Sequence, residues 1–310
     1  MTSDADALVA ELGPVAGLAA VDADLAELTT LRVGGRARLL VEAETDADLA
    51  AVGRVCGRRQ MPWAVVGRGS NLLVSDAGWP GVVVVLGRAF RGVEIIGRRV
   101  VAGGAQPLPA LARTVADAGL VGIAWAAGVP GSVGGGVRMN AGAHGREFAD
   151  VLVEVDVVRL ASGVREVWPV AQLGLRYRRS ELPADAVIVA ATLELEQGSP
   201  DEVRAEVEQV RAWRREHQPI NLPNCGSVFT NPPGDSAGRL IEASGGKGLS
   251  VGGATVSDLH ANFIVTRPGA TAGDVHALVR RLRRLVADDH GVVLRPEVAM
   301  LGPFPDWDAP

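Results

Sequence analysis

The sequence predicts an α+β protein of two or three subdomains. At 310 residues the chain exceeds the size that one hydrophobic core usually serves. Short apolar strands and amphipathic helices follow one another in mixed order, without the regular alternation of a parallel α/β sheet. No G-x-G-x-x-G motif opens an early helix, so a Rossmann domain is not favoured.

Helix caps and residue periodicity predict the elements of the first two thirds of the chain. Thr45 and Asp48 form a capping pair before the stripe of Leu49, Val52 and Val55, which predicts a helix over 45–56. A second helix is expected over 107–118. Apolar or alternating runs predict strands at 63–66, 82–86, 99–102, 151–160 and 187–195.

A boundary at residue 198 separates a last region. Ser199, Pro200 and Glu202 mark the start of a helix that ends near Pro219. Its apolar face is predicted from Val203, Val207, Val210 and Trp213. Beyond it we expect a strand at 262–266, a helix over 271–287 and a final strand at 292–301.

Composition narrows the functional classes. A net charge of −5 does not suit nucleic-acid binding, and no apolar run is long enough to span a membrane. Two cysteines and an N-terminus without a basic segment favour a cytoplasmic protein without a disulfide framework. No H-E-x-x-H and no pair of C-x-x-C motifs occurs, so no metal site is expected.

Two glycine-rich segments are candidates for ligand contact. Residues 67–71 follow a strand and can present successive N–H groups to a diphosphate, although an ordinary glycine-rich turn is the alternative. Residues 127–145 form a long stretch of small residues, which inside a compact domain usually contacts a ligand. A flexible surface loop is the alternative there, but Val129, Val133 and Met139 favour burial.

Three polar residues stand in unusual surroundings. Ser227 lies in a turn between Gly226 and an apolar pair, where its hydroxyl either transfers a proton or merely caps the turn. Glu297 lies in an apolar segment, where a carboxylate needs a partner or a chemical task unless it faces the rim. Arg178 follows Tyr177, and a surface cation stacked on the ring is the simpler interpretation.

Taken together, these segments resemble the UDP-N-acetylenolpyruvoylglucosamine reductase (MurB) family. The matching runs occur in family order across about residues 25–302. They are 29–37, 67–73, 127–145, Tyr177-Arg178 with Ser180, 223–232, 237–241 and Leu294 with Pro296 and Glu297. Arg178 and Ser227 lie close in sequence, so the chain resembles the short form of the family, without the extra substrate-covering insertion.

The resemblance implies a fold and a domain order. It implies an FAD-binding module of the PCMH, or vanillyl-alcohol-oxidase, type with two α+β subdomains, followed by an α+β substrate-binding domain. The expected divisions are residues 1–95, with 303–310 returning to them, then 96–198, and then the substrate-binding domain at 199–302.

The resemblance also implies a reaction. NADPH reduces FAD, flavin N5 delivers hydride to C3 of the enolpyruvyl ether of UDP-N-acetylglucosamine, and the product is UDP-N-acetylmuramate, a peptidoglycan precursor. Arg178 and Glu297 would stabilise the enolate-like charge, with Glu297 carrying or sharing a proton. Ser227 would give a proton to C2 as the general acid.

Further contacts follow from the same resemblance. The predicted FAD contacts are Arg32, Gly67, Arg68, Gly69, Ser70, Asn71, Gly103, Gly128, Val129, Pro130, Gly131, Ser132, Gly134, Gly135, Asn140, Gly142 and His144. Ser70 stands where some relatives of this fold attach flavin through histidine, so FAD should be non-covalent. The predicted substrate contacts are Tyr177, Asn231, Arg214 and Arg215, and a monomer is expected.

Four positions depart from the family pattern: Thr29, Ala124, His144 and Thr230 replace asparagine, an acidic residue, tyrosine and lysine. They leave open a paralogue that acts on a modified sugar nucleotide. A different flavin oxidoreductase, or a flavin- or nucleotide-binding module without turnover, is the other alternative. The presence of Arg178, Ser227 and Glu297 argues against both.

Overall fold

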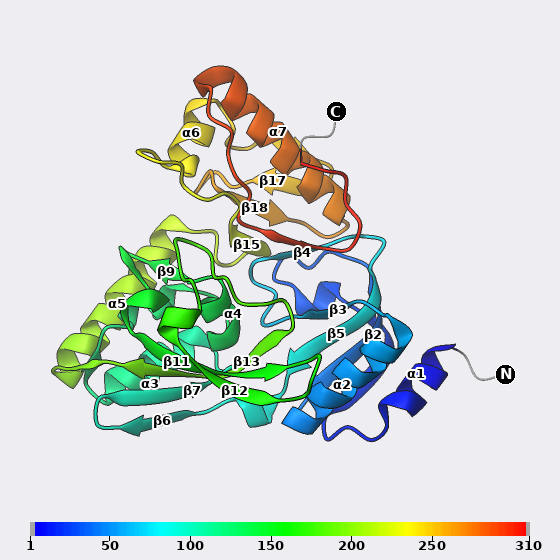
Figure 1. Ribbon diagram of the computed structural model, residues 1–310. Helices are drawn as coiled ribbons and strands as arrows, with labels where there is room; N and C mark the ends of the chain where they lie inside the picture. The colour runs from blue at the N-terminus through cyan, green and yellow to red at the C-terminus, as the bar shows by residue number, and fades with distance from the viewer. Residues whose placement is uncertain (1–3, 308–310) are drawn as a thin grey trace. The chain divides into compact units, whose positions relative to one another are not determined.

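The computed structural model describes residues 4–307, which form two compact units (Figure 1). The first unit comprises residues 4–22, 38–68 and 81–213, and the second comprises 23–37, 69–80 and 214–307. The secondary structure is mixed, as the sequence predicts. The three-part division at 95, 198 and 302 stays a prediction.

The N-terminal part of the first unit is built on a four-stranded sheet of order β1-β2-β5-β3. Its helix α2 carries the predicted capping box, in which the Thr45 side chain accepts from Asp48 N and the Asp48 side chain accepts from Thr45 N. Apolar residues of α1, α2 and the sheet share one core. The bounds are α1 Asp4–Leu12, β1 Leu18–Asp24, β2 Arg36–Ala43, α2 Asp46–Arg59, β3 Trp63–Val65, β5 Trp79–Leu86 and the 3-10 turn η2 Arg88–Phe90.

A five-stranded antiparallel sheet of order β12-β11-β13-β7-β6 forms the rest of the first unit (Figure 1). Helices α3 and α4 pack on the face that presents Val100 and Ala102, whereas Val187 and Val189 of β13 join the core of α2. The bounds are β6 Val93–Ile96, β7 Arg99–Gly103, α3 Leu108–Asp117, α4 Val133–Arg138, β11 Leu152–Arg159, β12 Arg165–Pro169 and β13 Ala186–Glu194.

Short elements connect these layers. They are β8 Leu120–Val121, which pairs with β14 Glu196–Gln197, β9 Gly142–Ala143, which pairs with β10 Arg146–Glu147, and the 3-10 turns η3 Ala124–Gly128, η4 Phe148–Asp150 and η5 Val170–Gln172.

Helix α5, Pro200–His217, begins and ends where the sequence predicts. Val203, Val207 and Val210 are buried, but Trp213 is 42% exposed. The prediction that Trp213 belongs to the buried face is therefore wrong. Its ring instead meets His144 edge to face, with centroids 5.0 Å apart.

The second unit contains an antiparallel sheet of order β15-β18-β17-β16 and a parallel pair of β4 and β19. Helices α6 and α7 share its core with Phe229 and Ile264. The bounds are η1 Ala26–Leu28, β4 Leu72–Val74, β15 Asn224–Ser227, α6 Ala237–Ala243, β16 Ser250–Val251, β17 Ala254–Val256, β18 Phe263–Thr266, α7 Ala272–His290 and β19 Ala299–Leu301.

The end of the chain packs within this second unit. Ser75 Oγ donates to Pro303 O at 2.8 Å, and His276 stacks between Phe304 and Trp307. The predicted return of 303–310 to the first subdomain is not decided by these contacts, and 308–310 lie outside the described residues.

Two predicted segments differ from the structure. Residues 133–138, expected as loop, form α4, because buried backbone needs internal hydrogen bonds, here from Gly136 N to Ser132 O at 2.8 Å. The strand expected at 292–301 is reduced to Ala299–Leu301 and an isolated bridge between Pro296 and Phe229. Pro296 has no N–H to donate to a ladder, which limits regular pairing there.

Candidate active site

Three of the predicted flavin segments meet in the first unit. Gly67 approaches Ser132 so closely that a β-carbon on Gly67 would lie 2.7 Å from the Ser132 hydroxyl oxygen. Gly134 N donates to Gly104 O at 2.9 Å, which joins the 128–135 segment to the end of β7. Segments that are far apart in sequence therefore form one small-residue surface, as a cofactor with a long contact surface requires.

The backbone N–H groups of residues 67–71 are the predicted diphosphate contacts. Among the described residues, none of these five N–H groups donates a hydrogen bond to a backbone or side-chain acceptor. A backbone hydrogen bond from Thr30 N to Gly69 O, 3.1 Å long, fixes the loop. Unused N–H groups on a fixed loop fit the diphosphate of a dinucleotide such as FAD.

Gly69 fixes the shape of this loop. Its φ is +60°, and a β-carbon there would lie 1.9 Å from Leu28 O. Only glycine combines this conformation with such a close approach. The adjoining turn of residues 29–32 closes with a bond from Arg32 N to Thr29 O at 3.3 Å, and Arg32 is exposed with a φ of +54°.

Arg178 stands at the tip of a tight hairpin in the first unit. Arg176 and Arg179 exchange both backbone hydrogen bonds, each at 2.9 Å, and Arg178 takes the left-handed φ of +55°. Its guanidinium donates through Nη2 to Gly142 O at 2.7 Å and lies over the exposed Tyr177 ring, 5.0 Å from the centroid. The stacked surface cation that the sequence left open is present, but it is also tied to a predicted flavin segment.

The side chain of Asn140, predicted as a flavin contact, is engaged with the protein. Asn140 is 0% exposed, its Oδ1 accepts from Ala149 N at 3.0 Å and its Nδ2 donates to Arg176 O at 3.1 Å. Backbone contact with a cofactor stays a prediction for this residue. The neighbouring His144 is exposed and faces Trp213, which sequence reasoning placed in the core.

Ser227 and Glu297 lie on adjacent segments of the second unit. Glu297 N donates to Val228 O at 2.8 Å, and Phe229 forms a bridge with Pro296. Both Ser227 and Glu297 are half-buried. The two residues, 70 positions apart in the chain (297 minus 227), are thus brought to one place by pairing of their backbones.

Asn262, which sequence reasoning did not select, fixes the segment that follows Ser227. It is 4% exposed, its Oδ1 accepts from Phe229 N at 2.9 Å and its Nδ2 donates to Phe229 O at 2.8 Å. Its own carbonyl accepts from Val228 N at 2.9 Å. A buried amide at the start of an apolar strand was the available signal, since such a group needs partners.

Asn71, another predicted flavin contact, reaches the Glu297 segment in the second unit. Its Nδ2 donates to Glu297 O at 3.1 Å, and its carbonyl accepts from Ala299 N at 3.1 Å. The last residue of the glycine-rich loop therefore supports the backbone on both sides of Val298.

The local electrostatics do not favour Cys225 as a nucleophile. Burial, assisted by the negative charge of Glu297, raises the pKa of the Cys225 thiol to about 12. A thiol with that pKa stays protonated and unreactive at neutral pH.

The predicted substrate residues of the second unit make different local contacts. Asn231 Oδ1 accepts from Ala237 N at 3.0 Å at the start of α6. Arg214 Nε donates to Gln218, and burial lowers its pKa, whereas Arg215 is exposed. Thr230, where the family has lysine, donates its hydroxyl to Arg295 O at 3.3 Å.

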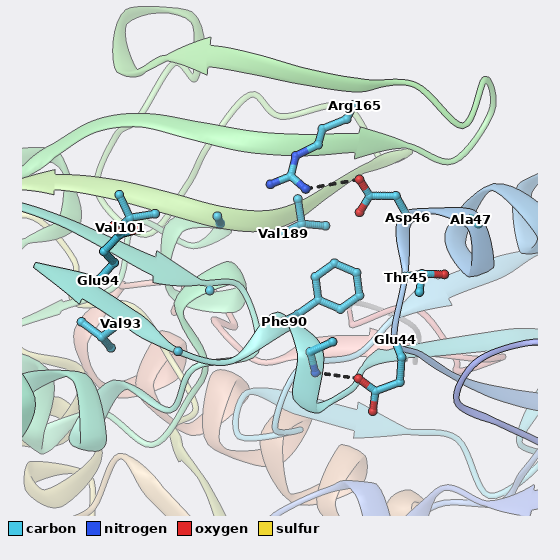
Figure 2. A pocket seen from close by; sticks show the side chains of 14 residues that line it. Glu44, Thr45, Asp46, Ala47, Phe90, Val93, Glu94, Val101, Arg165 and Val189 are labelled. Atoms are coloured by element: carbon cyan, nitrogen blue, oxygen red, sulfur yellow. Dashed lines mark hydrogen bonds and ion pairs between the residues drawn. The ribbon is translucent and has the colours of Figure 1, made fainter.

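The first unit also contains a hollow of about 700 Å³ (Figure 2). Figure 2 shows it between the start of α2, η2 and the five-stranded sheet, with Phe90, Val93 and Val189 on its walls. Two of its carboxylates are engaged: Glu44 accepts from Arg88 N and Ala89 N, and Asp46 pairs with Arg165. Gly103 alone of the predicted flavin contacts lines it.

Residues 4–307 contain no candidate metal cluster and no candidate membrane-spanning helix. No group of three or more His, Cys, Asp and Glu side chains is arranged to hold a metal ion. No helix in this range is both long enough and apolar enough to cross a membrane.

Comparison with known proteins identifies both parts of the chain. Residues 37–167 match the model of an FAD binding domain, and residues 218–301 match the C-terminal domain of UDP-N-acetylenolpyruvoylglucosamine reductase. The fold is thus confirmed as an α+β FAD-binding module of the PCMH type with a C-terminal domain of this reductase.

Relatives match over most of their length. The UDP-N-acetylenolpyruvoylglucosamine reductase of Heliobacterium modesticaldum is 45% identical over 88% of each chain, and that of Methylorubrum extorquens strain PA1 is 43% identical over 96% of each. The crystal structure of the Thermus caldophilus reductase is 37% identical, covers 92% of this chain and 99% of its own, and superposes with a TM-score of 0.80. The chain therefore belongs to the UDP-N-acetylenolpyruvoylglucosamine reductase family, FAD-containing oxidoreductases of peptidoglycan precursor synthesis.

Proposed function

We propose that the protein reduces the enolpyruvyl ether of UDP-N-acetylglucosamine to UDP-N-acetylmuramate, with NADPH as reductant and non-covalent FAD as cofactor. A UDP-N-acetylenolpyruvoylglucosamine reductase that matches this chain over 96% of its length supports the reaction. The single structural observation that carries the proposal is the hydrogen bond from Glu297 N to Val228 O, because it places a hydroxyl and a carboxyl on neighbouring segments.

FAD would be held by the glycine-rich segments. The N–H groups of 67–71 would bind the diphosphate, and the 128–135 and 140–145 segments would contact the rest through backbone. When bound, FAD would supply the redox chemistry, which is transfer of the electrons of NADPH as hydride to C3 of the enolpyruvyl group. Ser70 offers no ring nitrogen for covalent attachment.

Arg178 and Glu297 would stabilise negative charge on the substrate. As hydride reaches C3, charge develops towards the carboxylate of the enolpyruvyl group. A guanidinium can donate two N–H bonds to that carboxylate. Arg178 Nη2 donates to Gly142 O, which ties this guanidinium to a predicted flavin segment. A Glu297 carboxyl that carries or shares a proton would donate to the same charge.

Ser227 would complete the reaction by giving its hydroxyl proton to C2, after which solvent reprotonates the serine. A hydroxyl is a weak acid, so this role depends on placement beside a strongly basic carbon. Gly226 with φ +76°, and Asn262 behind Phe229, hold the segment on both sides of Ser227. A fixed donor avoids the cost of ordering it during the reaction.

The test separates the two halves of the reaction by stopped-flow absorbance of the flavin. Ser227→Ala should be reduced by NADPH at the rate of the unmodified protein. Its reoxidation by UDP-N-acetylenolpyruvoylglucosamine should fall by a factor of about 100 to 10,000, the usual contribution of a general acid. Ser250→Ala is the matched control, because Ser250 is exposed in the β16–β17 hairpin and bonds Gly248 and Thr255. Reoxidation of Ser227→Ala at the unmodified rate removes Ser227 from the mechanism, and unmodified protein that this substrate does not reoxidise refutes the proposed function.

A second candidate is a paralogue that acts on a modified sugar nucleotide. Thr230 in place of lysine and the exposed pair of His144 and Trp213 motivate it. A panel of UDP-sugar enolpyruvyl ethers, compared by kcat/KM, distinguishes the two. We further propose that the protein is cytoplasmic and monomeric. Gel filtration of the holoprotein tests the oligomeric state.

A further inference from the structure

We propose that Asn140 is a positioning residue for Arg178 and not a flavin side-chain contact. The inference rests on the proposed function, in which Arg178 stabilises charge on the substrate. All of the contacts that carry it lie within the first unit.

Three hydrogen bonds fasten the Arg178 hairpin to the 138–142 segment. Ser180 Oγ donates to Arg138 O at 2.7 Å, Asn140 Nδ2 donates to Arg176 O at 3.1 Å, and Arg178 Nη2 donates to Gly142 O at 2.7 Å. They involve alternate residues of the 138–142 segment. Of the three, the Asn140 bond alone holds the hairpin backbone directly.

Asn140 is built into this position. It is fully buried and takes the left-handed φ of +42°, which asparagine tolerates better than most residues. Its side-chain Oδ1 accepts from Ala149 N, and its side-chain Nδ2 donates to Arg176 O. Both ends of the side chain are used, so little of it is left to recognise a cofactor.

Arg178 needs such support. A left-handed φ at an arginine is strained and persists where surrounding contacts over-determine it. The exchange of bonds between Arg176 and Arg179 shapes the turn, but it does not fix where the turn sits. The Asn140 bond fixes the position of the turn. Arg178 can then place its guanidinium at Gly142, in the segment predicted to contact flavin.

The decisive variant is Asn140→Asp in the holoprotein. It keeps an oxygen for Ala149 N and the left-handed preference, but it removes the donor to Arg176 O. We expect unchanged flavin content and an unchanged rate of reduction by NADPH. Reoxidation by UDP-N-acetylenolpyruvoylglucosamine should fall about 100-fold through kcat with KM little changed, as misplacement of a catalytic group by about 1 Å would cause. Asn221→Asp, at an exposed position, is the matched control and should behave as the unmodified protein.

A double-mutant cycle separates positioning from general damage. In an Arg178→Ala background, Asn140→Asp should slow reoxidation by less than about twofold, because the group that it positions is gone. Asn140→Gly, which retains the left-handed conformation and adds no charge, repeats the cycle if the aspartate variant does not fold.

Different results would refute the role of Asn140 and the proposed function. Loss of flavin from either variant, or an equal effect with and without Arg178, overturns the inference while the proposed function stands. Reoxidation of Asn140→Asp and Asn140→Gly at the unmodified rate also overturns it. Failure of the unmodified protein to be reoxidised by the substrate refutes the proposed function instead.

Discussion

Glu297 donates its backbone N–H to the carbonyl of Val228 at 2.8 Å, one residue beyond Ser227. This bond joins the segments of two half-buried polar residues that lie 70 positions apart in the sequence (297 minus 227). Two asparagines reinforce the arrangement, since Asn262 holds Phe229 and Asn71 holds Glu297 O. The backbones of both segments are thus fixed by these hydrogen bonds.

Asn262→Ala should destabilise the protein strongly. The substitution leaves the N–H and carbonyl of Phe229 without their buried partners, and each loss costs about 1–3 kcal/mol. We expect the free energy of unfolding to fall by about 2–4 kcal/mol in urea titrations. Asn221→Ala, at an exposed position, should change it by less than about 0.5 kcal/mol. A fall of similar size in both variants would contradict the assigned role of Asn262.

Gly69→Ala should impair flavin binding. A β-carbon at Gly69 meets Leu28 O at 1.9 Å and must displace the 67–71 loop. Gly97→Ala is a matched control, because Gly97 has nearly the same φ, +62°, but no atom within 4 Å of the added carbon. Gly97→Ala should cost about 1 kcal/mol of stability and retain FAD. Equal FAD content in the two purified variants, measured by absorbance after denaturation, would show that the loop does not bind the cofactor.

Cys225 should make the protein sensitive to alkali. Burial raises the pKa of its thiol from 9.0 to about 12, so the folded state keeps a proton that the unfolded state loses. The stabilising effect is complete below pH 9 and is lost as pH rises towards 12, by about 1.4 kcal/mol per pH unit. Urea midpoints between pH 8 and 10.5 should fall less in Cys225→Ala. The same thiol should react with Ellman's reagent only after unfolding, and rapid reaction in the folded protein would contradict its burial.

His276 should contribute an acid-dependent loss of stability. Burial beside Phe304 and Trp307 lowers its pKa below the ordinary 6.5, with the Arg280 charge acting in the same direction and a backbone bond at Pro305 opposing it. A depressed pKa means that the stabilising effect is present above pH 6.5 and is lost as pH falls through the folded value. Fluorescence of Trp307 should report release of this segment in acid. His276→Gln should weaken the dependence of this fluorescence change on pH. An unchanged pH dependence in this variant would show that other groups cause the loss of stability in acid.

The sequence came closest to the structure where local rules suffice. The caps at Thr45 and Thr271, and the apolar stripes of α2, α3 and α7, depend on residues within a few positions of each other, and these helices form where expected. It was less accurate where distant contacts decide. Part of the 127–145 segment forms the helix α4, and the expected strand at 292–301 makes only an isolated bridge between Pro296 and Phe229 before β19.

By itself, the sequence determined the α+β class, the helices α2, α3, α5 and α7, the two glycine-rich segments and the polar residues Arg178, Ser227 and Glu297. The tertiary structure alone decided how these residues are supported. It placed Glu297 beside the Ser227 segment and brought Asn140 into hydrogen-bond contact with the Arg178 hairpin. It also left Trp213 exposed, in contact with the His144 ring. The reason is physical: such contacts join residues far apart in the chain, and no local propensity encodes the hydrogen bonds that buried backbone must find after the chain has folded.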